Sequence, residues 1–290
     1  MPELPEVETV RLGLAEYLTG AKITGVEVLD VRSLKRHLPG PADFISVMTG
    51  ATLKHMSRRG KFLWIPLDRD GLAMVGHLGM SGQMLVREAG SEPDKLTRVI
   101  LHAVSPEGKK LELRFVDQRL FGSLAIDNLV EVEHGEHLPT TVTHIARDPL
   151  DPNFDETFVL KKLRTRTSGI KKVLLDQGIM SGVGNIYADE ALWRAKLHYD
   201  HPANAVSAVK MRELMNHVKE ILAAAVEVGG TSFDEQYKNV NGQSGYFEVS
   251  LNAYGMTGRP CPRCGRVIVR ENWMNRGSHF CPKCQKRPVL

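Results

Sequence analysis

The first six residues of the chain, Met1-Pro2-Glu3-Leu4-Pro5-Glu6, have the residue types for covalent chemistry. If the initiator methionine is removed, which a small second residue such as proline usually permits, Pro2 becomes a free secondary amine beside the carboxylate of Glu3. A secondary amine that attacks a sugar aldehyde carbon gives a cationic iminium, which is a strong electron sink for eliminations. Because α-amino groups ordinarily titrate at about pH 8, a usable fraction is unprotonated at neutral pH.

A helix is expected to begin directly after this amine. Apolar residues recur at helical spacing, and Pro5 and the nearby acids suit the first turn and its dipole. The apolar positions are Leu4, Val7, Val10, Leu14 and Leu18. Taken by itself, this pattern is also that of an ordinary amphipathic N-terminal helix without any chemical role.

All four cysteines of the chain lie near its C-terminus, as Cys261-x2-Cys264, sixteen residues, and Cys281-x2-Cys284. This spacing is typical of a four-thiolate zinc site. Four thiolates leave no open coordination position, so we predict one structural zinc ion rather than a catalytic one. Its binding would hold an arm that has too few apolar residues to fold alone.

The net charge of +4 is small, but the cations are clustered. Residues 259–290 hold eight Lys and Arg against one acid. A second cluster, between residues 161 and 172, has six cations and no acid, and a third comprises Lys54, Arg58, Arg59 and Lys61. A charge run is often only a solvated face, but three of them favour a polyanion as partner.

Length and composition are those of an ordinary globular protein. The chain has 290 residues, enough for two domains or so, with 42% hydrophobic and 25% charged residues. The N-terminus is acidic and lacks a continuous apolar stretch, and no run reaches the roughly 18 apolar residues that span a bilayer. We therefore expect a cytoplasmic protein with no membrane partner.

The pattern of hydrophobic residues changes along the chain, which predicts an α+β multidomain protein. Short β-rich segments separated by Gly, Pro and Asp come first and indicate a β-sandwich that carries the N-terminal helix, over residues 1–135. The expected strands are 22–31, 51–56, 61–67, 72–77, 83–86, 98–104, 110–116 and 122–126. After a linker the period becomes helical, with helices expected over 154–163 and 171–177 and from Ser207 to Gly229-Gly230.

Between these helices lies Ser181-Gly182-Val183-Gly184-Asn185, followed by IYADE. A Gly-rich loop that runs into a helix can hold a phosphate on its backbone N–H groups. The Lys-Ser/Thr of a nucleotide P-loop is missing, which argues against an ATPase. Two helices gripping one DNA phosphate fit this loop better.

PELPEVETV resembles the N-terminus of the bacterial formamidopyrimidine-DNA glycosylases (8-oxoguanine DNA glycosylase/AP lyase). In that family the processed N-terminal proline is the nucleophile and the next glutamate is the acid, roles that fall here on Pro2 and Glu3. The resemblance also implies that Glu6 orients the first helix and a water. Lys61, in Arg58-Arg59-Gly60-Lys61, matches a family lysine that binds a phosphate at the lesion.

Further motifs carry the same resemblance. Met80 in His77-Leu78-Gly79-Met80-Ser81-Gly82, with Arg119 and Phe121, matches the residues that fill the gap left by a flipped nucleotide. GVGNIYADE resembles the family's helix–two-turns–helix signature, in which Asn185 contacts the DNA backbone. Lys171 matches a lysine facing the DNA near the abasic sugar, and Arg276 an arginine that clamps phosphates. Two positions depart from the family: Gln118 replaces a proline, and Met256 stands where a basic residue is common.

The resemblance covers nearly the whole chain and implies three domains. Residues 1–135 would be the catalytic β-sandwich, residues 150–235 the helix–two-turns–helix DNA-binding domain, and residues 236–290 the lesion loop and a C-terminal β-hairpin zinc finger. Gly245-Tyr246-Phe247 matches the loop that closes over the damaged base. Endonuclease VIII-type glycosylases share the zinc arm and the helices, but they usually begin Pro-Glu-Gly-Pro-Glu, so Leu4 and the Arg119/Phe121 pair favour the purine-specific branch.

The function implied is a bifunctional DNA glycosylase/AP lyase of base excision repair that removes oxidised purines and cuts the strand by β,δ-elimination. Its partner would be double-stranded DNA containing oxidised purines or abasic sites. We expect a monomer associated with the bacterial nucleoid. Two alternatives remain open: a non-catalytic DNA-binding protein that uses the zinc arm and helices alone, and a family member that binds damaged DNA without turnover because Met1 is retained.

Overall fold

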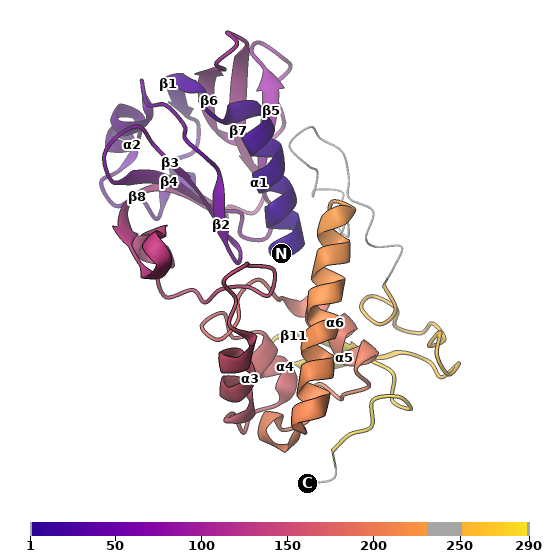
Figure 1. Cartoon of the computed structure of the whole chain (residues 1–290). Helices are drawn as coiled ribbons and strands as arrows, with labels where there is room; N and C mark the ends of the chain where they lie inside the picture. The colour runs from indigo at the N-terminus through magenta and orange to yellow at the C-terminus, as the bar shows by residue number, and fades with distance from the viewer. Residues whose placement is uncertain (1, 231–250, 289–290) are drawn as a thin grey trace. The chain divides into compact units, whose positions relative to one another are not determined.

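A computed structural model describes residues 2–230 and 251–288, which form two compact units (Figure 1). We call residues 2–144 with 229–230 the N-terminal unit, and residues 145–228 with 251–288 the C-terminal unit. The first includes the indigo and purple sheets of Figure 1, and the second the orange helix and the yellow arm.

Two antiparallel sheets form most of the N-terminal unit. One has the strand order β1-β6-β7-β5 and the other the order β2-β3-β4-β8-β9. The strands of the first sheet are β1 Lys22–Val28, β5 Gly82–Glu88, β6 Thr97–Val104 and β7 Lys110–Asp117. Those of the second are β2 Ser57–Arg59, β3 Phe62–Pro66, β4 Leu72–His77, β8 Ser123–Glu131 and β9 His137–Pro139.

One hydrophobic core joins both sheets with two helices, α1 (Leu4–Leu18) and α2 (Pro41–Met48). The expected stripe of α1 faces this core, where Leu14 and Leu18 are fully buried. Burial of each such side chain stabilises the fold by about 1.5–3 kcal/mol. The predicted α+β class, with a sandwich that carries an N-terminal helix, is confirmed.

The strand expected over 51–56 is wrong, and the helix α2 was not predicted. Residues Thr52 and Leu53 make only isolated bridges, because this segment bonds to two different neighbours. The backbone N–H of Leu53 donates to Ala21, whereas that of the next residue, Lys54, donates to Pro66. Neither neighbour accompanies the segment long enough to make a ladder.

The C-terminal unit is helical and ends in a β-hairpin. Ser207 caps its longest helix by accepting a hydrogen bond from the Lys210 N–H, as a helix start at Ser207 requires. The helices are α3 Glu156–Arg164, α4 Ile170–Leu174, α5 Asn185–Arg194 and α6 Ala208–Glu227. The hairpin pairs β10 (Val269–Trp273) with β11 (Arg276–Phe280), and no helix of the described residues could cross a membrane.

Candidate active site and zinc centre

The start of α1 holds the proposed nucleophile in place. The backbone N–H of Glu3 donates a 2.8 Å hydrogen bond to the Glu6 carboxylate, which satisfies one donor that a helix start leaves open. Pro2 is buried, and the exposed fractions of Glu3 and Glu6 are only 3% and 6%. Chain ends are ordinarily loose, so this arrangement gives the amine the fixed position that a nucleophile needs.

An ion pair ties the β2–β3 hairpin to α1. Arg58 donates to the Glu8 carboxylate at 2.8 Å, and Arg11 donates to the same group at 2.7 Å. Burial opposes ionisation of Glu8, but hydrogen bonds from Arg11 and Arg58, together with their charges, lower the pKa of Glu8 below its usual value. Lys61 lies in the two-residue turn of this hairpin, so the structure places it on an element joined to the helix that Pro2 precedes.

Met80, Arg119 and Phe121 come together on two loops of the N-terminal unit. Met80 lies between β4 and β5, and the other two lie between β7 and β8. All three side chains are exposed: 37% of Met80 and 47% of Phe121 is open to solvent. The Arg119 guanidinium lies 5.0 Å from the centre of the Phe121 ring, close enough for a cation–π contact.

His77 supports the Met80 loop from the end of β4. Its Nδ1 accepts a 3.1 Å hydrogen bond from the Gly79 backbone N–H, which requires that this nitrogen carry no proton. Burial, and then the charges of Arg36, Lys61 and Lys35, lower the pKa of His77 from 6.5 to about 4. The folded protein therefore keeps this histidine neutral at physiological pH.

The acids of the α5 motif hold the C-terminal arm. Asp189 accepts a 2.8 Å hydrogen bond from the His279 N–H in β11, and the amide of Asn185 donates to the Gly277 carbonyl at 3.0 Å. Glu190 accepts from the backbone N–H groups of three consecutive residues, 252–254, at 2.7 to 3.1 Å. Burial raises the pKa of Glu190, and these backbone hydrogen bonds oppose that rise.

The expectation that Lys171 faces DNA is corrected by its burial. Its exposed fraction is 0%, and its ammonium pairs with Asp189 at 2.7 Å. It also donates to the Ser278 hydroxyl at 2.7 Å and lies 5.0 Å from the centre of the Trp273 ring. Asp189 lies on α5, whereas Ser278 and Trp273 lie on the β10–β11 hairpin. Lys171, on α4, therefore holds the hairpin against the two helices.

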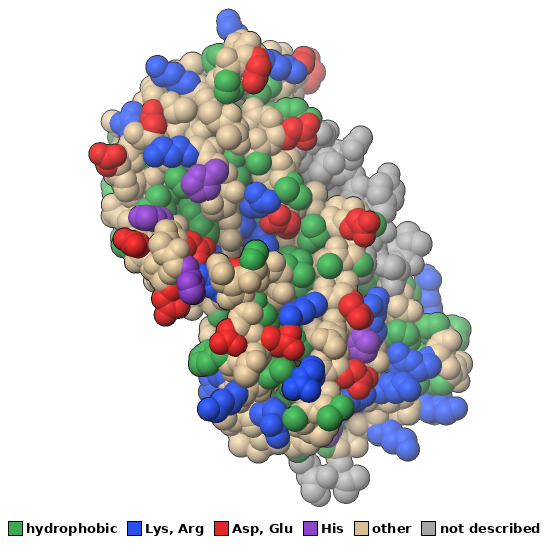
Figure 2. All heavy atoms as spheres, in the orientation of Figure 1, with side chains coloured by type: hydrophobic (Ala, Val, Ile, Leu, Met, Phe, Trp, Pro, Cys, Tyr) green, Lys and Arg blue, Asp and Glu red, His purple; other side chains and the backbone are tan. Residues whose placement is uncertain are grey.

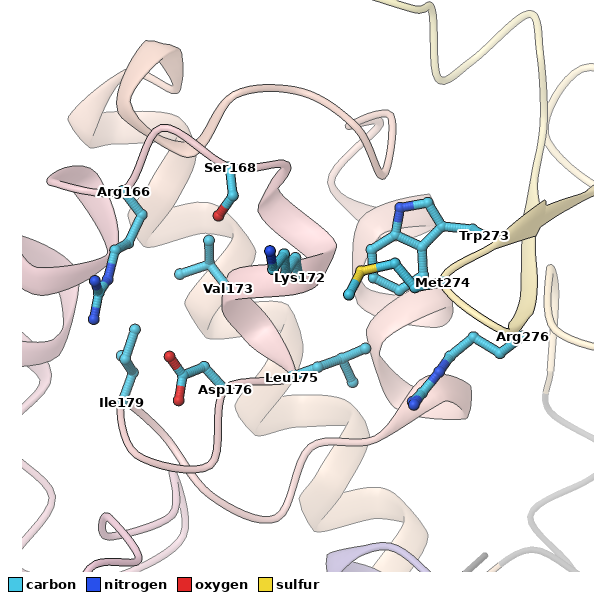
Figure 3. Close-up of a pocket in the computed structure, with 10 residues that line it drawn as sticks. All are labelled: Arg166, Ser168, Lys172, Val173, Leu175, Asp176, Ile179, Trp273, Met274 and Arg276. Carbon is cyan, nitrogen blue, oxygen red and sulfur yellow. The ribbon is translucent and has the colours of Figure 1, made fainter.

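Arg276 begins β11 and points into a hollow of the C-terminal unit with a volume of about 480 Å³ (Figure 3). Figure 3 shows Arg166 and Arg276 on opposite sides of this hollow, with Lys172 between them. The other lining residues are Ser168, Val173, Leu175, Asp176, Ile179, Trp273 and Met274. Three cations from three segments favour an anionic ligand here.

The four cysteines converge as their spacing predicts. The sulfur atoms of Cys261, Cys264, Cys281 and Cys284 all lie within 4.8 Å of one another. Burial and hydrogen bonds to the neighbouring thiols raise the pKa of Cys284 to about 12, whereas hydrogen bonds lower that of Cys261 to about 7 against the effect of burial. A metal ion would therefore displace a proton from Cys284 when it binds. Sulfur ligands at this spacing suit one zinc ion, and their closed set leaves no position for substrate.

Residues 251–288, which we call the zinc arm, contact the end of α5. Arg263 lies 4.0 Å above the Trp193 ring and donates to the Trp193 carbonyl at 3.0 Å. The amide of Gln285 donates to the Leu197 carbonyl at 2.9 Å. All eight Lys and Arg of the arm are exposed, and Figure 2 shows Lys and Arg gathered over it.

Sequence reasoning missed the buried acids Asp117, Asp189 and Glu190. Their only local signal is a carboxylate among apolar neighbours, and their partners lie far along the chain. Residues 231–250 lie outside the described residues, and with them Gly245-Tyr246-Phe247, the expected lesion loop.

Comparison with known proteins places these features in one family. The model of the formamidopyrimidine-DNA glycosylase N-terminal domain matches residues 1–124, that of the family's H2TH domain residues 145–236, and that of the zinc finger found in FPG and IleRS residues 258–287. The formamidopyrimidine-DNA glycosylase of Leifsonia xyli subsp. xyli is 56% identical, covering 99% of this chain and 100% of its own. That of Nocardioides sp. is 52% identical, covering 99% and 95%.

Solved structures agree. A variant of Lactococcus lactis FPG in complex with Fapy-dG-containing DNA matches with a TM-score of 0.85 and 32% identity, over 99% of this chain and 100% of that one. Lactococcus lactis Fpg in complex with DNA containing an abasic site gives a TM-score of 0.84 at 32% identity, over 98% and 100%.

Because folding lowers the pKa of His77, stability should fall in acid. The unfolded chain takes up this proton near pH 6.5, whereas the folded protein resists it until about pH 4. The contribution of His77 to the free energy of unfolding is therefore fully present above pH 6.5 and is lost as the pH falls toward 4, a decrease of at most about 3 kcal/mol. We predict that the free energy of unfolding in urea falls less between pH 7 and pH 4.5 in His77→Gln than in the wild type, with exposed His134→Gln as control. Equal falls in all three proteins would contradict this account.

The Lys171–Asp189 pair should be costly to break from one side. Asp189→Asn leaves a buried ammonium without its counter-charge, which typically costs about 3–5 kcal/mol. We expect urea unfolding to show this loss, and the double variant Lys171→Met/Asp189→Asn, whose Asn oxygen can still accept from the His279 N–H, to regain most of it. Exposed Glu227→Gln is the matched control. If Asp189→Asn were as stable as this control, Lys171 would not depend on Asp189.

Proposed function

Because the chain belongs to the formamidopyrimidine-DNA glycosylase family, we propose that it is a bifunctional DNA glycosylase and AP lyase of base excision repair. It removes oxidised purines, 8-oxoguanine and formamidopyrimidines, from duplex DNA and cleaves the strand at the resulting site. The observation that carries this proposal is the buried start of α1, where Pro2 and Glu3 adjoin a helix N-terminus held by Glu6. Its relatives named above supply the substrate class.

The reaction begins when the damaged nucleotide is turned out of the duplex. The Pro2 nitrogen, freed by loss of Met1, attacks C1′ of the sugar while Glu3 protonates the ring oxygen, which opens the sugar and releases the base. The iminium so formed acidifies the C2′ protons. Successive β- and δ-eliminations then break the strand on both sides, and hydrolysis of the iminium frees Pro2. Glu6 orients the helix and a water.

Other residues hold the DNA. Lys61, at the hairpin tied to α1, binds a phosphate at the lesion, and Arg276 and Asn185 bind the backbone from the C-terminal unit. The exposed cations of the zinc arm and of the Arg276 hollow support this assignment. Zinc supplies no chemical step and holds the arm in shape. The protein acts as a monomer near the nucleoid, through the three domains 1–135, 150–235 and 236–290.

Met80, Arg119 and Phe121 occupy the space that the extruded nucleotide leaves. Flipping costs a few kcal/mol of stacking and pairing, so an unfilled gap would let the base fall back. A thioether and a phenyl ring are apolar wedges of the kind other DNA-kinking proteins insert. Arg119 donates hydrogen bonds to the orphaned cytosine, whose edge offers acceptors at O2 and N3.

The covalent step predicts a trapped complex on Pro2. Borohydride should reduce the iminium on lesion-bearing duplex, and peptide mapping should find the DNA adduct at residue 2. Glu3→Gln should lose most base excision while it still binds DNA. An adduct on a lysine, or undiminished trapping by a chain that keeps Met1, would falsify the assignment.

The wedge predicts an effect of the opposite base. Arg119→Ala should lower excision opposite cytosine and compress the cytosine-over-adenine ratio, because adenine offers a different pattern of donors and acceptors. Phe121→Ala should slow excision whatever the opposite base, yet affect cleavage of ready-made abasic sites much less. Single-turnover rates on matched duplexes measure both effects. Wild-type rates and ranking in both variants would place the wedge elsewhere.

A further inference from the structure

Asp117 is a buried carboxylate at the end of β7 that accepts hydrogen bonds from a hydroxyl and from backbone N–H groups. Its exposed fraction is 0%. One oxygen accepts hydrogen bonds from the Ser81 hydroxyl at 2.6 Å and the Arg119 backbone N–H at 3.2 Å, and the other accepts from the Gly122 N–H at 2.8 Å. A buried acid is costly unless such bonds replace its water. The three donors come from both of the loops that carry the exposed Met80, Arg119 and Phe121.

We propose that Asp117 and Ser81 are positioning residues that lock these two loops together as one wedge, an inference that rests on the proposed function. Ser81 follows Met80, and its hydroxyl both donates to Asp117 and accepts from the Arg119 N–H at 3.0 Å. Gly122 follows Phe121. Arg119 is therefore bonded directly to Asp117 and Ser81. Met80 and Phe121 are the chain neighbours of Ser81 and Gly122, which both bond to Asp117.

The backbones of the two loops also touch. A Cβ atom on Gly79 would come within 2.4 Å of the Phe121 carbonyl carbon, and its φ of +63° already favours glycine. A Cβ on Gly122 would meet the Phe115 ring at 2.8 Å and the His77 carbonyl at 2.9 Å. The loop backbones therefore pack directly at Gly79, and the hydrogen bonds of Asp117 and Ser81 add fixed polar contacts between the loops. A change there moves Met80 relative to Phe121.

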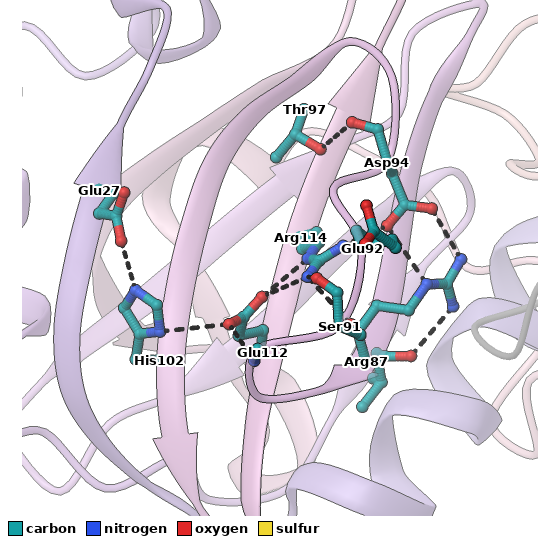
Figure 4. Close-up of polar contacts among 11 residues, drawn as sticks. Glu27, Arg87, Ser91, Glu92, Asp94, Thr97, His102, Glu112 and Arg114 are labelled. Carbon is teal, nitrogen blue, oxygen red and sulfur yellow. Dashed lines mark hydrogen bonds and ion pairs between the residues drawn. The ribbon is translucent and has the colours of Figure 1, made fainter.

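The alternative is that Asp117 only stabilises the sheet, and the same strand offers a control for that. Glu112, on β7, is also buried, with an exposed fraction of 7%, but it pairs with Arg114 at 2.6 Å and belongs to a network with Arg87, Asp94 and His102 (Figure 4). Glu112 itself bonds to Arg114, His102 and the Gly90 N–H, and these three residues lie outside the wedge loops. Glu112→Gln therefore removes a buried charge from β7 without touching the wedge.

The test compares two reactions of the full-length protein on duplex DNA. Asp117→Asn keeps the shape of the side chain but directs N–H groups at one or more of its donors. We expect base excision to fall about ten-fold or more, because small misplacements of positioning groups cost up to about 100-fold, while cleavage of ready-made abasic sites changes much less. Glu112→Gln should lower thermal stability but leave the ratio of the two rates unchanged.

A double-mutant cycle then separates positioning from general damage. If Asp117 acts through the wedge, Asp117→Asn/Phe121→Ala should excise about as slowly as Phe121→Ala alone. Multiplied losses, or an equal loss on abasic sites, would overturn the proposal. If Asp117→Asn does not fold, Ser81→Ala replaces it, with the same ratio expected to fall several-fold. If the wild type did not excise damaged bases, the proposed function itself would be wrong. If Phe121→Ala were slow but Asp117→Asn or Ser81→Ala excised at the wild-type rate, only the positioning role of Asp117 and Ser81 would be wrong.

Discussion

A nucleophile at the end of a chain must be held as firmly as one inside a domain, and the N-terminal unit meets this constraint at the start of α1. The backbone N–H of Glu3 donates a hydrogen bond to the Glu6 carboxylate, which caps the first turn of α1. Farther along, Leu14 and Leu18 anchor α1 in the core of the sandwich. The Glu8–Arg58 pair then joins the helix to the hairpin that carries Lys61. The proposed chemistry depends on these contacts because they place an amine that would otherwise fray.

The C-terminal unit uses buried acids for a comparable purpose. The zinc arm shares a small core with α5, built around Trp193 of the helix and Ala253, Ile268 and the buried cysteines of the arm. Polar contacts also join the arm to α5: Asp189 and Glu190 accept backbone hydrogen bonds from β11 and from residues 252–254. Because unpaired carboxylates are costly inside a protein, these bonds favour one docking of the arm. Zinc completes the arm, and α5 orients it.

Features that rest on local spacing could be predicted from the sequence. The cysteine pairs, the apolar stripe of α1 and the cap at Ser207 each depend on residues close together in the chain, and all three are as expected. Positions that depend on distant partners could not be predicted. Lys171 reads as one more cation in a basic run, yet Asp189 and Ser278 draw it into the interior. Likewise, the residues next to Asp117 and Glu190 in the sequence do not indicate their hydrogen-bond partners, which lie far along the chain. The strand expected over 51–56 does not form because the segment pairs with two different neighbours.

We propose that the amine of Pro2 is the reacting group, and the proportion of active sites tests this assignment most directly. Protein prepared with graded removal of Met1 would be analysed by intact mass, and its active sites counted from the burst of product on a lesion-bearing duplex. We predict that the fraction of active protein equals the fraction of chains that begin at Pro2, from none to all. A full burst from chains that retain Met1 would contradict it.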